Sequence, residues 1–315
     1  MKKTNNINYK NLLLLVILIL FPLLVSNRYY LHIMMVIGIA IIYGIGFNIF
    51  FGYCGQISFG HAGFYAIGAY TAVLLHIHLG INYFLSSIVA MVFTGIVAFL
   101  LGYPFLRLRE HYLAMASMAF LLIIKAITIQ WRELTFGPAG VIGIEIPKIF
   151  SLELKDNSLY YLILMVTILI FFVTKNLMNS FLGRAFIAIR DNEDAAPSLG
   201  INTFFYKNIA FSLSAICTGL AGVLYAYLNL YIGPECFGLD LSILAILIVV
   251  VGGSGTDSGP VIGAVILSLL PEMIYGFEDY HLISYGLVLL FFLLFMPKGI
   301  MGLLNNHGYF LKGAK

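Results

Sequence analysis

Charge is scarce in this sequence, and its scarcity narrows the class of protein. Only 10% of the 315 residues are Asp, Glu, Lys or Arg, whereas 61% are hydrophobic. A water-soluble chain of this length needs far more polar surface. The apolar runs recur along the whole chain, and the short alternating pattern of a membrane β-barrel is absent. The predicted fold class is therefore all-α, a polytopic integral membrane protein.

Signatures of an energy source or of catalysis are also missing. No G-x-x-x-x-G-K-[ST] loop that could hold nucleotide phosphates occurs. All 14 acidic residues fall in loops or near the ends of apolar runs, so the chain offers little machinery for an ion-coupled carrier. Neither a catalytic residue nor a cofactor nor a metal site is predicted for this chain.

The few cysteines and the small net charge exclude further classes. Cys54, Cys217 and Cys236 cannot all pair, and each lies in or beside an apolar run. They are predicted to be buried thiols. A net charge of +3 indicates no nucleic-acid partner, and the excess of Lys and Arg is better read as topology information.

The apolar runs predict about ten membrane spans, each needing about 20 residues unless the helix is broken. The first is interpreted as a retained span rather than a cleaved signal peptide. The eighth and ninth are short and flank the sequence GGSGTDSG, so they are expected to be broken or re-entrant. The ten segments are 11–26, 31–50, 57–79, 83–103, 112–131, 159–178, 207–229, 241–252, 259–275 and 281–296.

The distribution of positive charge predicts the orientation. With the N-terminus in the cytoplasm, most of the 17 basic residues fall on the cytoplasmic side, which favours N-in, C-in with an even number of spans. Residues 1–315 are then one transmembrane domain. Residues 179–206 form a cytoplasmic loop, and residues 132–157 form an ordered external loop.

One dense polar segment, GRAFIAIRDNEDAAPSLGI, interrupts this apolar chain between spans six and seven. Its pattern predicts a short amphipathic helix, which Pro197 should end near Ala195 or Ala196. The residues alone leave open whether the segment binds a partner or is a solvated loop. The side facing the protein would carry Phe181, Ala185, Ala188, Ile189 and Asn192.

Two spans carry small residues at steps of three and four, which would place them on one face of each helix for close packing. Such faces could border a translocation path or serve ordinary bundle packing, and glycine-interrupted spans in both halves suggest an internal repeat. The third span has Gly55, Ser58, Ala62, Ala66 and Ala69. The seventh has Ser212, Ala215, Gly219, Gly222 and Ala226.

A few polar side chains within the spans allow two interpretations. His61 could be a hydrogen-bonded packing residue or part of a path. Lys125 is expected in the outer half of its helix, where it could snorkel to the interface or line a path. His76 and His78 are predicted to lie at a membrane interface rather than to bind metal.

Three blocks of sequence resemble the LivM/LivH-type permeases of ATP-binding-cassette importers for branched-chain amino acids, and the likeness spans roughly residues 34–303. The first block matches G-R-A-x-x-A-I-R-x-N-E-x-A-A-x-x-L-G-I at Gly183, Arg184, Ala185, Ala188, Ile189, Arg190, Asn192, Glu193, Ala195, Ala196, Leu199, Gly200 and Ile201. The second matches G-Y-x-G-Q-x-S-x-G-H-A at Gly52, Tyr53, Gly55, Gln56, Ser58, Gly60, His61 and Ala62. The third, RLREHYLAM, begins at Arg107.

This resemblance implies a membrane-embedded half of a translocation pore in a bacterial cytoplasmic membrane. The implied partners are a second homologous permease, two ATPase subunits that hold ATP and magnesium, an extracytoplasmic substrate-binding protein, and the lipid bilayer. The chain itself would not be an enzyme. The polar segment would be the coupling element seated on the ATPase, formed by Gly183, Arg184, Ala185, Ala188, Ile189, Arg190, Asp191, Asn192, Glu193, Ala195, Ala196 and Gly200.

The expected substrates are leucine, isoleucine or valine, and the expected polar groups along the path are Gln56, Ser58, His61 and Lys125. Three departures from the family pattern stand out: Pro197 replaces a basic residue, Glu110-His111 replaces Gly-Asp, and Leu122 replaces an acid three residues before Lys125. A urea or short-amide importer of the same class, a stand-alone carrier or channel, and a scaffold without transport are the alternatives.

Overall fold

The computed structural model describes residues 9–24, 27–108, 110–149, 152–273, 286–287, 290 and 299–302. Its longer helices are α1 (Tyr9–Leu24), α2 (Arg28–Asn48), α3 (His61–Leu79), α4 (Tyr83–Phe105), α5 (Glu110–Gln130), α7 (Asn157–Met178), α8 (Phe181–Asp191), α9 (Thr203–Asn229), α10 (Leu239–Gly252) and α11 (Gly259–Met273). The short elements are α6 (Arg132–Thr135), β1 (Val141–Ile142), β2 (Lys148–Ile149), β3 (Leu152–Glu153) and β4 (Tyr231–Ile232).

Among the described residues, six helices are long and apolar enough to cross a membrane: α2, α3, α4, α5, α7 and α9. They correspond to predicted spans two to seven, with ends that differ by a few residues. Helices α10 and α11 are shorter, as expected for spans eight and nine. The predicted tenth span, 281–296, lies almost wholly outside the described residues. The protein is thus a helical polytopic membrane protein.

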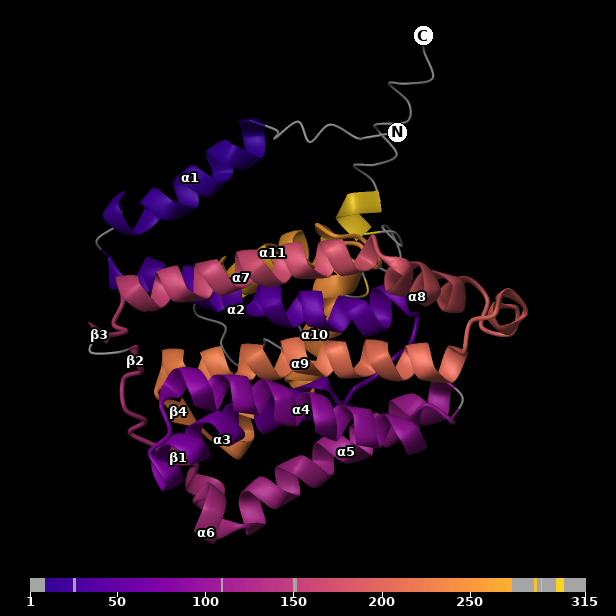
Figure 1. Cartoon of the computed structure of the whole chain (residues 1–315). Coiled ribbons are helices and arrows are strands. Elements are labelled where there is room, and N and C mark those ends of the chain that lie inside the picture. The colour runs from indigo at the N-terminus through magenta and orange to yellow at the C-terminus, as the bar shows by residue number, and fades with distance from the viewer. Residues whose placement is uncertain are drawn as a thin grey trace.

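The long helices lie side by side, with α8 at one end of the bundle and β1–β4 at the other (Figure 1). These are called the α8 end and the strand end. Helices α2 and α9 form the centre, since 83% of the α2 window and 72% of the α9 window are buried. For α7 the share is only 22%. Helices α2 and α9 can be buried all round because they are apolar on every side.

Helices α3 and α9 approach each other through glycine. A Cβ atom at Gly68 would collide with the backbone of Gly219, and one at Gly222 would collide with the carbonyl oxygen of Tyr65. Close backbone contact of this kind lets helices associate in lipid, where no hydrophobic driving force acts between them. The predicted small residues on these helices are also buried: Ala62, Ala66, Ala69, Ala215 and Ala226.

The prediction that Gly55 and Ser58 lie on the small-residue face of a helix is wrong. Helix α2 ends in a π-helical turn, Ile49–Tyr53, and α3 begins only at His61. Gly55 lies between them with φ +75°, a left-handed conformation that suits glycine and ends the helix. Gly55 and Ser58 therefore belong to a non-helical segment, residues 54–60.

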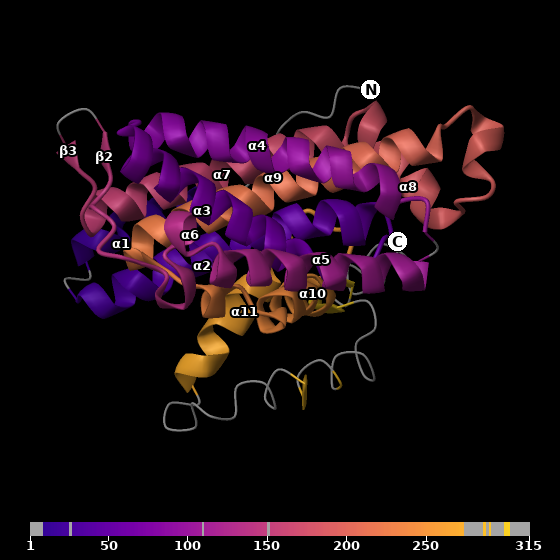
Figure 2. The ribbon, with the colours of Figure 1, turned by 90° about the horizontal axis from the view of Figure 1, so that it is seen from below.

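A second break separates α10 from α11. The two helices pack as a tight hairpin, because Gly252 contacts Gly259 and Gly263 contacts the carbonyl oxygen of Ile248. The connecting loop is residues 253–258. Both helices of the hairpin pack against α2, and in Figure 2 the hairpin lies toward the lower side of the bundle.

The described residues of the segment 132–157, which are 132–149 and 152–157, form short elements at the strand end. Strand β1 pairs with β4 in antiparallel register, Val141 opposite Ile232, and β2 pairs with β3. The β1–β4 pair ties this loop to the segment that leads into α10. Nearby, the His76 ring stacks on the Tyr83 ring at 3.7 Å.

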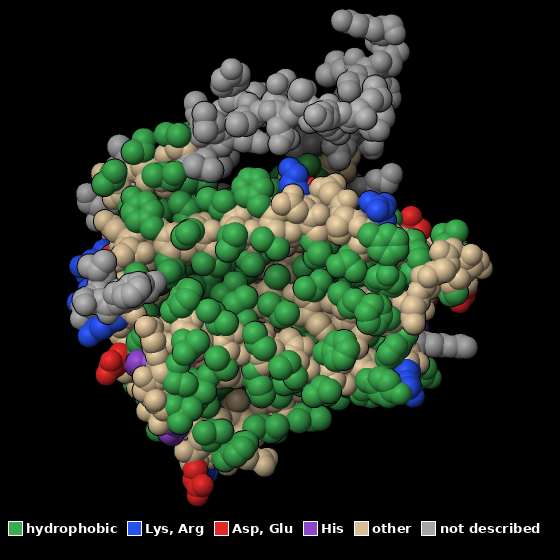
Figure 3. Space-filling model, in the orientation of Figure 1, with side chains coloured by type: hydrophobic (Ala, Val, Ile, Leu, Met, Phe, Trp, Pro, Cys, Tyr) green, Lys and Arg blue, Asp and Glu red, His purple; other side chains and the backbone are tan. Residues whose placement is uncertain are grey.

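The outer faces of α4, α5 and α7 are apolar and exposed. Figure 3 shows hydrophobic side chains across the face of the bundle, with charged side chains gathered at its edges. A face of this kind suits contact with lipid. Among the cysteines, Cys54 and Cys217 are buried as predicted and Cys236 is half-buried.

Replacing Gly222 by Ala tests the α3–α9 contact. The added methyl group must displace the Tyr65 backbone, and overpacking of this kind costs about 1–3 kcal/mol. We expect a lower melting temperature of the purified protein in detergent. Ala126→Val, on the exposed face of α5, adds volume without a backbone clash and should melt like the wild type. Equal melting of the two variants would contradict this packing.

Candidate functional site

Helix α8 is the rigid part of the polar segment, and its sequence explains its start. Ser180 caps it, with the side-chain oxygen accepting a hydrogen bond from the backbone N–H of Leu182 at 3.2 Å. Its inward face is made of Gly183, Ala185, Phe186 and Ile189. The prediction of an amphipathic helix is correct, but Phe181 is exposed and Phe186 takes the expected core position.

The end of α8 differs from the expectation that Pro197 would stop it near Ala195. The helix ends at Asp191, because Asn192 is extended and its side chain accepts a hydrogen bond from the N–H of Ala195 at 3.0 Å. Pro197 instead sits in a 3₁₀ turn, Ala196–Leu199. An asparagine that bonds to nearby backbone competes with helix continuation.

Gly183 and Gly200, the two glycines of the predicted coupling element, have different roles. Gly183 lies inside α8, where its missing side chain lets the helix pack directly on the backbone of Met178. Gly200 has φ +77° and ends the 3₁₀ turn, as a left-handed cap. Gly183 therefore sets the corner between α7 and α8 rather than an end of the helix.

Arg190 points inward to the first helix break. Its Nη1 donates a hydrogen bond to the carbonyl oxygen of Gly52 at 3.0 Å. Gly55 packs against the Arg190 side chain, as does Gly255 from the loop between α10 and α11. One cation thus joins α8 to both non-helical segments.

The loop at 253–258 is held by the end of α2. Asn48 donates to the carbonyl oxygen of Thr256 at 3.1 Å and accepts from the N–H of Gly255 at 3.0 Å. The Tyr53 hydroxyl donates to Asp257 at 2.5 Å. These bonds satisfy backbone groups that the broken helices leave without partners.

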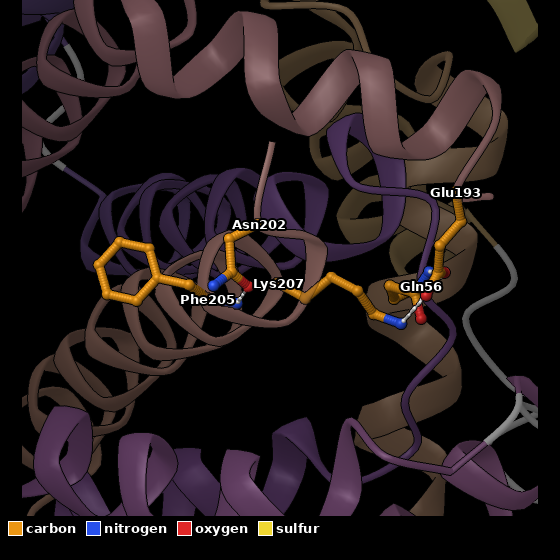
Figure 4. Close-up of polar contacts among 5 residues, drawn as sticks. All are labelled: Gln56, Glu193, Asn202, Phe205 and Lys207. Atoms are coloured by element: carbon orange, nitrogen blue, oxygen red, sulfur yellow. Dashed lines mark hydrogen bonds and ion pairs between the residues drawn. The ribbon is translucent and has the colours of Figure 1, made fainter. Parts of the chain in front are cut away.

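Glu193 connects the same segment to α9. Its carboxylate accepts from Lys207 Nζ at 2.8 and 3.1 Å and from Gln56 Nε2 at 3.3 Å (Figure 4). The Lys207 side chain is only 4% exposed, whereas that of Glu193 is 42% exposed. Asn202 caps α9 by accepting from the N–H of Phe205, which places Lys207 one turn further along.

Lys207 is the residue of this site that sequence reasoning missed. It was expected simply on the cytoplasmic side, as one of many basic residues marking topology. A buried cation needs a partner, and helix α9 itself contains no Asp or Glu. The carboxylates of the polar segment were therefore the nearest candidates for a pair with Lys207. The pair closes a distance of 14 residues in sequence.

The remaining charged residues of the polar segment are directed outward. Arg184, Asp191 and Asp194 are exposed at the α8 end, as is the neutral side chain of Asn192. Arg190 also lies 3.4 Å from Asp191, although that pair is partly solvated. The segment therefore has an inward face that binds the helix breaks and an outward face whose few contacts are with near neighbours in sequence, such as Arg184 with the carbonyl oxygen of Asn179.

The predicted path residues lie deeper, and three of them follow one another into the bundle. Ser58 and His61 are fully buried, and the two ring nitrogens of His61 contact Ser58 Oγ at 3.2 Å and Ser214 Oγ at 2.7 Å. Gln56 lies at the entrance, beside Glu193. Lys125 is half-buried on α5 near its end at Gln130 and is not part of this group. Aromatic rings surround His61: Phe47, Phe50, Phe64 and Phe211.

Comparison with known proteins places this arrangement in context. Residues 29–295 match the family described as "Branched-chain amino acid transport system / permease component". The high-affinity branched-chain amino acid transport system permease protein LivM of Salmonella typhimurium is 32% identical over 312 residues, covering 91% of this chain and 73% of LivM.

More distant relatives cover less of the chain. The probable branched-chain amino acid transport permease protein LivM of Methanocaldococcus jannaschii is 23% identical over 68% of each chain. The D-allose transport system permease protein AlsC of Escherichia coli is 31% identical, but over only 39% of this chain and 33% of AlsC. No solved structure matches the chain significantly.

Neutralising Glu193 tests the pair with Lys207. Glu193→Gln leaves a buried cation without its counter-charge, which should lower the free energy of unfolding by about 2–3 kcal/mol. This is less than the roughly 3–5 kcal/mol of a fully buried pair, because water screens Glu193. Thermal unfolding in detergent measures the loss.

Two further variants control this experiment. Asp194→Asn removes a charge from an exposed neighbour and should leave the melting temperature unchanged. The exchange Glu193→Lys with Lys207→Glu should recover part of the loss, since it restores opposite charges. A double exchange no more stable than Glu193→Gln would show that the ion pair contributes nothing.

Proposed function

Because the chain belongs to the family of branched-chain amino acid transport system permease components, we propose that it is the membrane permease subunit of an ABC importer for leucine, isoleucine or valine. The observation that carries this proposal is the 32% identity to LivM over 91% of the chain. A permease component moves its substrate without changing it and is not an enzyme.

The proposed setting is a bacterial cytoplasmic membrane, with both termini in the cytoplasm and ten spans. In this orientation the α8 end faces the cytoplasm, and residues 179–206 form the coupling loop. The strand end faces outward, and residues 132–157 form the external loop. The gathering of Arg184, Arg190 and Lys207 at the α8 end supports this orientation.

The proposed partners supply what this chain does not carry. Two ATPase subunits bind ATP and magnesium, and an extracytoplasmic binding protein delivers the amino acid at the strand end. A second homologous permease completes the pore within the lipid bilayer. No nucleic acid takes part.

The coupling residues divide into two groups by their contacts. Arg184, Asp191, Asn192 and Ala195 are exposed and would meet the ATPase, whereas Arg190 and Glu193 bond inward and would transmit its movement. Such a segment moves as a rigid body, since its inward face is packed. The packed members are Gly183, Ala185, Ala188, Ile189 and Ala196, and Gly200 shapes the exit turn.

The proposed path runs beside residues 54–60. Gln56, Ser58 and His61 are buried in this conformation, so they would meet substrate only when the segment separates from α9. Movement of Glu193 acts on Gln56 and Lys207 together and would provide that separation. Lys125 is the remaining candidate for the path.

Uptake by the reconstituted complex tests the function. Proteoliposomes with this permease, its partner permease, the ATPases and the binding protein should accumulate leucine only when ATP is present on the ATPase side. Arg184→Glu should lower ATPase association and uptake at least fivefold, because it reverses an exposed charge of the docking face. Lys155→Glu, at the strand end, should leave ATPase association unchanged.

Three outcomes would contradict the proposal in different ways. Leucine uptake without ATP would identify a stand-alone carrier. Uptake of urea or a short amide in place of leucine would identify the related importer. Normal ATPase association by Arg184→Glu would remove Arg184 from the docking face.

Labelling from one side of the membrane tests the orientation. In a variant without its native cysteines, Asn192→Cys should react with a membrane-impermeant thiol reagent only from the cytoplasmic side, since residue 192 is exposed at the α8 end. Inside-out vesicles and intact cells supply the two sides. Labelling from intact cells would reverse the proposed topology.

A further inference from the structure

Helix α10 begins in the middle of the bundle rather than at either end. The Tyr43 hydroxyl donates to the carbonyl oxygen of Leu241 at 3.2 Å. At 1.5 Å per residue, Tyr43 lies about 22 Å from Arg28 and about 15 Å from Tyr53 along one continuous helix. The start of α10 is thus within the roughly 30 Å of hydrocarbon that such helices cross.

The start of α10 also meets the start of α3. Ser242 Oγ donates to the carbonyl oxygen of Phe59 at 2.7 Å and accepts from the N–H of Ala62 at 3.2 Å. Helices α3 and α10 therefore begin side by side at this depth. The chain enters α3 from the α8 end through residues 54–60, and it enters α10 from the strand end through residues 233–238.

An exposed carboxylate lies at this position. Asp240 is in the first turn of α10 and is exposed. Among the described residues, no hydrogen bond or ion pair satisfies its side chain. A charge of this kind facing hydrocarbon would cost about 2.5–3.5 kcal/mol. Asp240 must therefore face water or a polar partner.

A second observation marks the approach to Asp240 from the strand end. Tyr70 is only 5% exposed, and its hydroxyl has no hydrogen-bond partner within the described chain. Its ring packs edge-on against Phe237 at 5.8 Å, and the hydroxyl lies within electrostatic range of the exposed Glu235. A buried hydroxyl without a partner indicates water or a ligand beside residues 231–237, the segment that leads into α10.

We propose that Asp240 lines the translocation path and that its carboxylate receives the ammonium group of the amino acid at mid-membrane. A branched-chain amino acid is a zwitterion with an apolar side chain, so a path through lipid depth needs a partner for its charge. Helix capping alone would not require an exposed side chain at this depth. This inference rests on the proposed function and names the residue that meets the substrate.

Transport by Asp240→Asn is the first test. The variant keeps the shape and removes the charge, so uptake at saturating leucine and binding protein should fall at least tenfold. ATP hydrolysis stimulated by loaded binding protein should stay within twofold, because the coupling contacts lie elsewhere. Asp240→Glu should retain most uptake, because it keeps the charge. Unchanged uptake by Asp240→Asn would overturn the proposal.

Thiol labelling is the second test, and it does not depend on the substrate. In a variant without its native cysteines, Asp240→Cys should react with a hydrophilic thiol reagent at least tenfold faster than Leu169→Cys. Leu169 lies near the middle of α7 on its exposed apolar face. Equal rates would overturn the inference. Fast labelling of Asp240→Cys, together with a wild-type complex that transports no leucine, would refute only the proposed function.

Discussion

Backbone groups that leave a helix inside a membrane must find partners, because each unsatisfied N–H or C=O costs several kcal/mol in hydrocarbon. Two segments of this protein, residues 54–60 and 253–258, leave their helices under that constraint. Asn48 bonds the second segment at both Gly255 and Thr256. Arg190 satisfies the carbonyl oxygen of Gly52, just before the first segment, and Ser242 satisfies that of Phe59, near its end. The breaks persist because neighbouring helices supply these partners.

The same bonds explain how the polar segment could act on the membrane interior. Helix α8 lies at one end of the bundle, where Arg190 joins it to both breaks and Glu193, just after the helix, bonds to Lys207 on α9. Packed and bonded contacts of this kind pass on rigid-body displacement rather than absorb it. Helices α3 and α10, which begin side by side, are the elements that such a displacement would reach first.

Much of this architecture could be predicted from local pattern. Length and apolarity identified spans two to nine, and the density of charge identified α8. The predictions that were wrong concern backbone conformation. Gly55 was placed on a helical face because small residues continue at helical spacing through the break, and the spacing carries no sign of the left-handed turn. The end of α8 was placed near Ala195 because Pro197 is visible in sequence, whereas the side-chain turn at Asn192 is not.

Composition and periodicity by themselves determined that this chain spans a membrane, where its apolar runs lie and which segment carries its charge, because each of these depends on residues close together in sequence. Only the tertiary structure decided which charges are neutralised within the chain. Gln56 and Glu193 meet across 137 residues. Asp240, which looks like an ordinary residue at the end of a span, lies at mid-depth because Tyr43 and Ser242 hold the start of α10 there. Contacts between distant segments set depth and partners, and no local pattern records them.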